Sequence, residues 1–450
     1  MEIDDYQPIY LPLLTSEKSM KTSNISKLNF SGYKAFKDAQ ELTISPLSII
    51  FGYNNSGKSA IIRLLPMLAA SFSQSKRPTF IKSHLDYTAP CLRGATFKNI
   101  VNAYSNKMSF GIEWDDSESL NFEIKQQGFD EESITFITFG EQCDSKIKYH
   151  TYIEGLDEDK GPEQYELEDS PTKKVKLNNF SVFDLGSPEA PVHQSIHSKL
   201  EKLATSIFWL NAIRSQPPRE FVIDASTPKG IKYDGTGTAE TIWNLAKTKS
   251  PAFDAINSWL DETCGRVIEL GVLSQSTNNE RIVSKLETIS SSETPSNTPI
   301  RIPILDSGEG ISQALPVVTL CAQAAYGELG TNPIVMLEQP ELHLHPKAIV
   351  TLANFFIKCI KENTRAKFII ETHSESLLLA MQTAIAGKEI ELSNISTYWV
   401  SKGEADQGST ISKVEFDEEG YVVNNFPEEV FQEVYEQAKN LLEVREHKGA

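Results

Sequence analysis

One octapeptide near the N-terminus limits the possible fold of this 450-residue chain more than any other segment. Residues 52–59 read Gly-Tyr-Asn-Asn-Ser-Gly-Lys-Ser, which fits the pattern G-x-x-x-x-G-K-[ST]. The apolar run 47–51 before it is typical of a buried strand, and the pattern after it predicts a helix from Lys58 to about Ala70. The glycines let the loop curl, so its backbone N–H groups and the helix N-terminus form an anion site.

The chemistry of this loop predicts ATP and Mg²⁺ as its ligands. Lys58 is expected to reach the β- and γ-phosphates, and Ser59 is expected to bind Mg²⁺ through its hydroxyl. The whole loop would surround the phosphates, and we assign seven residues to nucleotide binding: Asn54, Asn55, Ser56, Gly57, Lys58, Ser59 and Ala60.

Two apolar segments in the C-terminal half end in polar residues. Residues 52–59 are called the P-loop below. A strand beside the one that precedes the P-loop would carry an acidic residue to the Mg²⁺ side of the phosphates. We place the segment 333–338 there, with Glu338 as a metal ligand, directly or through water. The segment 367–371 continues into Glu-Thr-His-Ser, and we expect His373 to point at the γ-phosphate.

A short turn before a predicted helix offers a second surface for phosphate. Residues 305–310 read Leu-Asp-Ser-Gly-Glu-Gly, and the N-terminus of the following helix favours anions. Ser307, Gly308 and Glu309 are therefore candidate nucleotide-binding residues. Taken alone, the motif is equally consistent with a plain turn.

Alternating strands and helices from Ile302 onward predict an α/β fold with a parallel sheet covered on both faces. Upstream, residues 95–180 have a strand-like and loop-rich pattern. The other expected elements are helices at 194–213, 239–247, 252–263, 311–327, 346–361 and 375–386, a loop at 286–299, strands at 396–400 and 411–416, and an amphipathic helix at 428–443.

Taken together, the motifs resemble the ABC-type ATPases of the overcoming-lysogenization-defect lineage, which are related to SMC-type ATPase heads. The resemblance covers about residues 24–425 and rests on the P-loop, S-G-E-G at 307–310, L-E-Q-P-E-L-H-L-H-P at 337–346, and E-T-H-S at 371–374. A middle stretch at 213–220, followed by Gly-Thr-Gly at 235–237, is also similar. It implies a parallel-sheet ATPase head with helices on both faces, a β-rich lobe and an inserted mixed α/β region.

The resemblance also implies an organisation in segments. We expect an N-terminal extension over 1–22 and the first part of the ATPase head over 23–94. The β-rich lobe and helical insertion would span 95–300, and the second part of the head 301–395. Two strands and the amphipathic helix would occupy 396–450. The extension and the helix would each pack on the head or contact a partner.

The position after Glu338 departs from many ABC-type ATPases, in which an acidic residue there activates the attacking water. Gln339 can orient water but cannot take its proton. We therefore expect catalysis to involve Gln339, Glu341 and His373, and three alternatives stay open: slow hydrolysis, help from Glu341 or His373, or a signal carried by binding. His343 and His345 suggest a metal pair, but relatives carry a dimer-contact loop there.

The resemblance implies heads that dimerise around ATP, with Ser307 and its neighbours contacting the γ-phosphate bound by the opposite subunit. It further implies a sensor or scaffold in bacterial antiphage defence that regulates a separate effector such as a nuclease. Relatives often carry a Toprim nuclease after the last motif, and we expect none in this chain. An SMC-like DNA-binding clamp is the alternative. A transporter ATPase is excluded, because transporter signatures lie much closer to the P-loop than Ser307 lies to Lys58.

The charge balance is acidic, with 61 Asp and Glu against 43 Lys and Arg, for a formal net charge of −18. Such a surface repels nucleic acid and anionic lipid, so DNA binding is possible only through a local basic patch. The five cysteines are scattered and form no C-x-x-C pair, which argues against a zinc site or a disulfide framework. No signal peptide and no membrane-spanning run is visible, so we expect a cytoplasmic protein.

Overall fold

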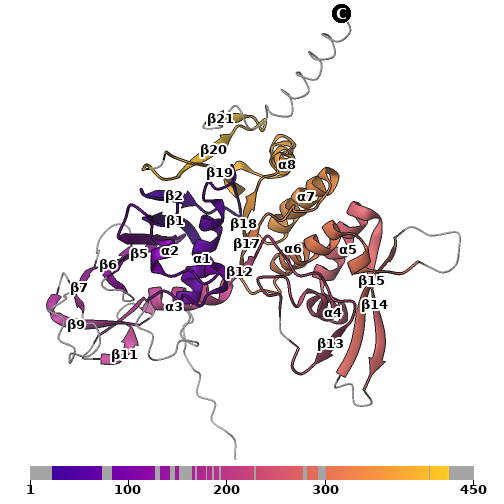
Figure 1. Cartoon of the computed structure of the whole chain (residues 1–450), viewed down its shortest axis with the longest axis horizontal. Coiled ribbons are helices and arrows are strands. Elements are labelled where there is room, and N and C mark those ends of the chain that lie inside the picture. Colours follow the sequence, from indigo (N-terminus) through magenta and orange to yellow (C-terminus); the bar gives the residue numbers. More distant parts are fainter. Residues whose placement is uncertain are drawn as a thin grey trace, which may run out of the picture.

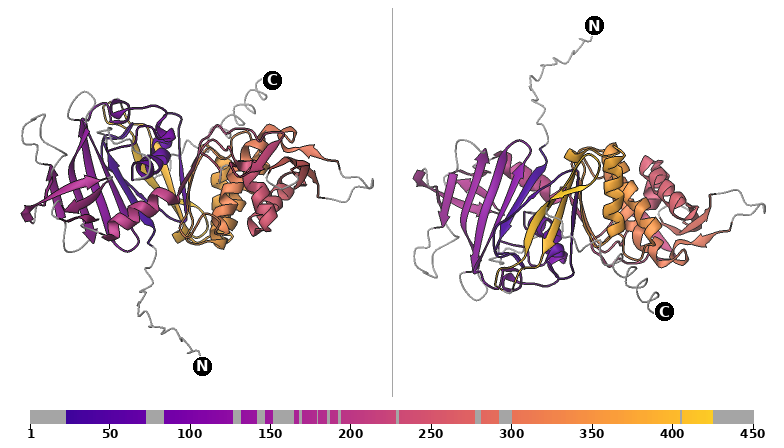
Figure 2. Two further views of the ribbon diagram at one scale, coloured as in Figure 1. Left: turned by 90° about the horizontal axis from the view of Figure 1, so that it is seen from below. Right: turned by 90° about the horizontal axis from the view of Figure 1, so that it is seen from above.

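The computed structural model describes most of the chain between Ser23 and Asn424. The described residues are 23–72, 84–126, 132–141, 147–151, 165–167, 170–178, 180–184, 187–191, 194–227, 230–276, 281–291, 300–404 and 406–424. The N-terminal extension at 1–22 and the amphipathic helix predicted at 428–443 lie outside them. Two lobes flank a central sheet (Figures 1 and 2).

The central sheet has seven strands and carries the predicted motifs. Five strands are parallel, in the order β12 (Ile207–Leu210), β17 (Ile334–Glu338), β18 (Lys367–Thr372), β3 (Leu47–Gly52) and β19 (Ile395–Ser401). The strands β20 (Thr410–Phe416) and β21 (Val422–Asn424) extend it in antiparallel fashion. The α/β fold class with a parallel sheet is thereby confirmed.

Helices cover both faces of this sheet, which explains why β3, β17, β18 and β19 are buried along almost their whole length. On β17, Ile334 and Met336 pack toward α1 (Lys58–Phe72), whereas Val335 and Leu337 belong to the core on the opposite face. That second core is built by α6 (Glu309–Ala325), α7 (Pro346–Glu362) and α8 (Glu375–Ala386). Figure 1 shows α1 on one side of the sheet and α6 and α7 on the other.

The strand-like region forms a ten-stranded antiparallel sheet whose order is β11-β10-β9-β8-β7-β6-β5-β4-β1-β2. The short helix α2 (Phe97–Ile100) and the longer α3 (Gln194–Ser206) accompany it. Its strands are β1 (Ile25–Ser31), β2 (Gln40–Thr43), β4 (Lys107–Trp114), β5 (Glu118–Gln126), β6 (Glu132–Glu141), β7 (Ile147–Thr151), β8 (Tyr165–Leu167), β9 (Ser170–Asn178), β10 (Ser181–Asp184) and β11 (Ser187–Pro191).

The other lobe combines two helices with a small sheet. The helices are α4 (Thr238–Thr248) and α5 (Pro251–Cys264). In the sheet, β15 (Arg281–Ser290) pairs with β13 (Phe221–Asp224), β14 (Arg266–Gln275) and β16 (Ile302–Pro303). The β14–β15 hairpin projects away from the central sheet (Figure 1).

Three expectations about local structure are wrong. The helix predicted at 194–213 ends at Ser206, because the next four residues, Ile-Phe-Trp-Leu, are β-branched, aromatic and apolar and form β12. The loop predicted at 286–299 begins inside β15, which continues to Ser290. The strand beside the P-loop strand is β18 rather than β17, so the acidic segment ending at Glu338 lies one strand further away.

None of the helices in the described part of the chain is long and apolar enough to cross a membrane.

Candidate functional site

The P-loop connects β3 to α1 and has the conformation that its glycines allow. Gly57 has a φ of 107°, and a Cβ there would lie 3.0 Å from the Phe36 ring. The Lys58 ammonium donates to the carbonyl oxygens of Gly52 at 2.9 Å and Tyr53 at 2.6 Å. Burial lowers the pKa of Lys58 to about 8, although Glu371 and Glu341 oppose the shift. The loop therefore surrounds a lysine that its own carbonyls hold in place.

The hydroxyl of Ser59 contacts a carboxylate that the sequence motifs did not single out. Ser59 Oγ donates to Glu371 Oε1 at 2.7 Å. Glu371 is only 2% exposed, and burial raises its pKa to about 7, with a further contribution from Glu338. Because β18 is adjacent to β3, the end of β18 brings Glu371 to the first turn of α1.

Glu338 is paired with arginine rather than with Ser59. Arg63 donates from Nε and Nη2 to both Glu338 oxygens, each at 2.6 Å. Trp209 Nε1 donates to Glu338 Oε1 at 3.0 Å, and Arg93 lies 3.9 Å from Oε2. Bidentate pairs of this kind fix the orientation of a carboxylate. Metal binding by Glu338 thus stays a prediction, for a side chain that already has partners.

The backbone of Gln339 adopts a left-handed conformation, with a φ of 42°. Its N–H donates to the carbonyl of Glu371 at 2.9 Å, and its carbonyl accepts from Arg214 Nη2 at 2.8 Å. The buried Arg214 also donates to the carbonyls of Glu338 at 3.0 Å and Gln313 at 2.9 Å. Burial lowers the pKa of Arg214 to about 10. This arginine thus links the end of β17 to α6.

Glu341 and His373 lie together at the same edge of the sheet. Glu341 Oε1 accepts from Thr372 Oγ1 at 2.6 Å and from the backbone N–H of His373 at 3.0 Å. Burial raises the pKa of Glu341. Burial, together with Lys58, lowers the pKa of His373. The structure therefore places Glu341 against the backbone of His373, and catalytic roles for the two side chains stay predictions.

The turn at 307–309 precedes α6 and has its own set of contacts. Ser307 Oγ lies 3.3 Å from Thr288 Oγ1. Glu309 accepts from Gln313 Nε2 at 3.3 Å and from Gln216 Nε2. Gly308 has a φ of 104°. Within the described residues, no hydrogen bond or ion pair joins this turn to the P-loop.

A model of one protein family matches residues 47–380, most of the chain. The description of the family reads "AAA domain, putative AbiEii toxin, Type IV TA system". The chain belongs to this AAA family. The matched segment contains the P-loop, the turn at 307–309 and the ends of β17 and β18. An ATP-binding ATPase domain therefore occupies it, and P-loop ATPases of this type generally use ATP and Mg²⁺.

Solved structures similar to this AAA-family chain include three heads of SMC proteins. One is an Smc head bound to the C-terminal winged-helix domain of ScpA, with a TM-score of 0.46 and 10% identity over 88% of this chain and 98% of that one. A second is an Smc head with an extended coiled coil, bound to the C-terminal domain of ScpA and derived from Pyrococcus furiosus. Its TM-score is 0.43, with 10% identity over 94% of this chain and 100% of that one. The third is an SMC head domain from Thermotoga maritima, with a TM-score of 0.37 and 12% identity over 87% of this chain and 99% of that one. No curated protein matches the sequence.

The residues of the AAA domain fit a phosphate group and a divalent cation. Among the residues that the structure describes, Ser56 Oγ, Glu341 Oε2 and Glu371 Oε2 are buried side-chain oxygens without a hydrogen-bond partner, and such atoms call for an explanation. The described residues contain no group of three or more His, Cys, Asp or Glu with metal-binding geometry. A Mg²⁺ site does not require such a group, because Mg²⁺ is usually held by one or two carboxylates together with phosphates and water.

Sequence reasoning missed three residues of the AAA domain that make the central contacts. Glu371 was noted only as the start of the E-T-H-S motif, and Arg214 only as part of a family resemblance. Arg63 was not noted at all. A usable signal existed for Glu371, because a carboxylate at the end of a buried apolar strand needs a partner.

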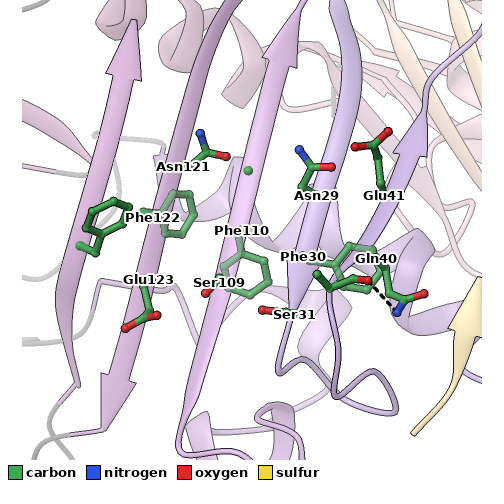
Figure 3. Close-up of a pocket in the computed structure, with 13 residues that line it drawn as sticks. Asn29, Phe30, Ser31, Gln40, Glu41, Ser109, Phe110, Asn121, Phe122 and Glu123 are labelled. Carbon is green, nitrogen blue, oxygen red and sulfur yellow. Dashed lines mark hydrogen bonds between the residues drawn. The ribbon is translucent and has the colours of Figure 1, made fainter. Parts of the chain in front are cut away.

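A cavity of about 460 Å³ lies on the antiparallel sheet and contains none of the predicted site residues. Asn29, Gly111 and Asn121 are register partners on the adjacent strands β1, β4 and β5. Figure 3 shows Asn29 and Asn121 on the strands either side of β4. A Cβ at Gly111 would lie 2.2 Å from Asn121 Oδ1, so the glycine makes room for that amide. This cavity is separate from the P-loop of the AAA domain.

Proposed function

We propose that the chain is an ATP-binding, slowly hydrolysing ABC-type ATPase whose heads assemble around ATP. In this proposal it senses a trigger or provides a scaffold, and it regulates a separate effector in bacterial antiphage defence. One observation carries the nucleotide part. Lys58 and Ser59 begin α1 beside Glu341 and Glu371, two carboxylates that each have a buried oxygen without a partner among the described residues.

The P-loop residues 54–60 bind the phosphates through backbone N–H groups and the N-terminus of α1. Lys58 exchanges the carbonyls of Gly52 and Tyr53 for phosphate oxygens, which are stronger partners because they are charged. A negative phosphate favours the charged form of a lysine whose pKa burial lowers to about 8. Binding and protonation of Lys58 therefore support one another.

When bound, Mg²⁺ neutralises the charge that develops on the transferred phosphoryl group. Ser59 would hold the ion through its hydroxyl. A carboxylate at the strand ends would share this role, and Glu338 and Glu371 are the two candidates.

Slow turnover follows from the residues around the attacking water. Gln339 orients the water, and the hydrogen bonds of its backbone to Glu371 and Arg214 fix its position. Glutamine takes no proton, so Glu341 serves as the acidic substitute in this proposal, held by Thr372 and the backbone of His373. In this proposal His373 faces the γ-phosphate. The nucleotide then acts mainly as an assembly signal that lasts until slow hydrolysis ends it.

Assembly uses the turn formed by Ser307, Gly308 and Glu309. No contact joins this turn to the P-loop of its own chain among the described residues. The N-terminus of α6 presents N–H groups that suit an anion. In the proposed dimer, the turn binds the γ-phosphate held by the partner subunit.

The effector part of the proposal rests on the resemblance to the overcoming-lysogenization-defect lineage and on the family description, which names a toxin of a toxin–antitoxin system. Both support the proposal that the protein works with a second component, such as a nuclease, and we propose that it does so in the cytoplasm. The net charge of −18 opposes direct binding to DNA, which is the basis of the alternative SMC-like clamp.

The test is the native mass and composition of the complex purified from its host with ATP and Mg²⁺. A nuclease or toxin that co-purifies with the wild type, and is lost in Lys58→Ala, supports an ATP-dependent scaffold. A homodimer that holds DNA and no second protein supports the clamp instead. A monomer that is unchanged by ATP contradicts both.

A further inference from the structure

Two side chains on α1 contact two carboxylates at the ends of adjacent strands. Ser59 and Arg63 are four residues apart and therefore lie on one face of the helix. Glu371 and Glu338 are register partners on the parallel strands β18 and β17, and neighbouring strands in a sheet lie about 4.8 Å apart. Ser59 donates to Glu371, and Arg63 donates to Glu338. The four side chains therefore form two neighbouring pairs.

Arg63 competes with the metal role that the sequence predicts for Glu338. Both carboxylate oxygens accept from the Arg63 guanidinium at 2.6 Å, and Oε1 also accepts from Trp209 Nε1 at 3.0 Å. A Mg²⁺ ion at Glu338 would lie beside a positive charge, and such repulsion is strong where the carboxylate is only 3% exposed. We therefore expect Arg63 to leave Glu338 when the metal binds.

Glu371 offers the displaced arginine a second partner. Its Oε1 accepts from Ser59 Oγ at 2.7 Å, while Oε2 is buried and has no hydrogen-bond partner among the described residues. Burial disfavours the charged form of Arg63, but Glu338 and, more weakly, Glu371 raise the pKa of Arg63. Both carboxylates therefore act electrostatically on the same guanidinium. A serine hydroxyl that binds Mg²⁺ through a lone pair keeps its hydrogen for Glu371 Oε1, so Oε2 stays open to Arg63.

We propose that Arg63 exchanges carboxylates when the nucleotide and its metal bind: it leaves Glu338, which then holds the Mg²⁺ directly or through water, and pairs with Glu371. Arg63 and Glu371 are positioning residues in this exchange, because they act on the metal through Glu338. The inference rests on the proposed nucleotide function, with Glu338 as the metal ligand. It gives the buried Glu371 a role, which is to stabilise the metal-bound state by receiving the arginine.

The test is a double-mutant cycle on Mn²⁺ affinity, measured by electron paramagnetic resonance on the full chain with a saturating non-hydrolysable ATP analogue. Glu371→Gln removes the charge that receives Arg63 and keeps the side-chain shape. Arg63→Gln removes the arginine, and the double variant lacks both charges. The control is Glu287→Gln, which removes a buried carboxylate that is paired with Lys285 on β15 and should bind Mn²⁺ as the wild type does.

We expect Glu371→Gln to lower Mn²⁺ affinity about tenfold, because Arg63 then stays on Glu338; residues coupled by contact show effects of this size. In the Arg63→Gln background no arginine competes for Glu338, so adding Glu371→Gln should lower the affinity by less than about threefold. Arg63→Gln alone should raise Mn²⁺ affinity. Arg63→Lys, which keeps the charge and loses the planar fork, should fall between Arg63→Gln and the wild type.

Three results overturn the exchange alone: an equal loss from Glu371→Gln in both backgrounds, no loss in either, or a lower Mn²⁺ affinity in Arg63→Gln. If Glu371→Gln does not fold, a structure of the wild type with the analogue and Mn²⁺ decides. Arg63 bonded to Glu371 supports the exchange, and Arg63 still bidentate on Glu338 overturns it. A wild type that binds no analogue overturns the proposed nucleotide function, and the exchange with it.

Discussion

Two glycine turns, one before α1 and one before α6, differ in what surrounds them. Gly57 and Gly308 have nearly the same φ, 107° and 104°, a region that favours glycine. A Cβ at Gly57 would lie 3.0 Å from the Phe36 ring, whereas a Cβ at Gly308 would meet nothing within 4 Å. The first turn is enclosed by its own chain, and the second is open.

The polar groups around the enclosed turn lack hydrogen-bond partners, whereas those around the open turn have them. Near the P-loop, Ser56, Glu341 and Glu371 each have a buried oxygen without a partner among the described residues. At the other turn, Ser307 lies against Thr288, and Glu309 accepts from two glutamines. The unpartnered oxygens around the P-loop favour a ligand that binds within the same chain. The turn before α6 is open, and its side chains already have partners within the chain. It is therefore accessible to a ligand held by another subunit, which supports the proposed contact between subunits.

The largest expected effect is on the enclosed turn. Lys58→Ala removes the only side-chain cation of the P-loop, and we expect ATP affinity to fall about 100-fold, or about 2.8 kcal/mol. Isothermal titration calorimetry with ATP and Mg²⁺ measures it. Lys34→Ala, which removes a lysine that is bonded to the carbonyl of Asn99, is the control. Unchanged affinity in Lys58→Ala would show that the loop does not bind nucleotide.

The next effect separates the two turns. Ser307→Arg places a long side chain on the open turn, so ATP should bind as in the wild type while ATP-dependent association is lost. Mass photometry with ATP and Mg²⁺ reports the association. Ser393→Arg adds the same bulk and charge to an exposed serine that donates to Glu391 and should assemble normally. Normal assembly of Ser307→Arg would remove this turn from the subunit interface.

The smallest effect concerns rate alone. Gln339→Glu supplies a proton acceptor beside the attacking water, and we expect turnover to rise about tenfold, below the usual range for general-base catalysis. Binding and association should not change, because Gln339 belongs to neither turn. Phosphate release under saturating ATP measures the rate, with Gln339→Ala as the control. An unchanged rate would assign the base to Glu341 or the limiting step to another stage.

The central fold and the P-loop could be predicted because both depend on local sequence. Buried parallel strands such as β3 and β17 are apolar runs, and the helices α1, α6, α7 and α8 were predicted to within two residues at each end. The order of the strands depends on crossover connections, so the sequence did not show that β18 separates β17 from β3. The short strand β12 was missed for a related reason: its four residues are ordered by pairing with β17.

The contacts within the site were less predictable than the residues. Motifs indicated Lys58, Ser59 and Glu338, but the partners of Ser59 and Glu338 depend on which strand ends lie beside α1. Arg63 fits any amphipathic helix, and only the fold places its guanidinium against Glu338. The same holds for Arg214, whose four carbonyl partners come from residues far apart in the chain or in a neighbouring turn.

Arg214 also connects two segments to which the proposed function gives separate roles. Its guanidinium holds the carbonyls of Glu338 and Gln339 on one side and that of Gln313 on the other, and only arginine presents a planar fork with enough donors for this. The end of β17 and the start of α6 are therefore connected through one buried guanidinium. In the proposed dimer, a shift of the turn at Ser307 would therefore be felt at the backbone of Gln339, because the two segments share Arg214.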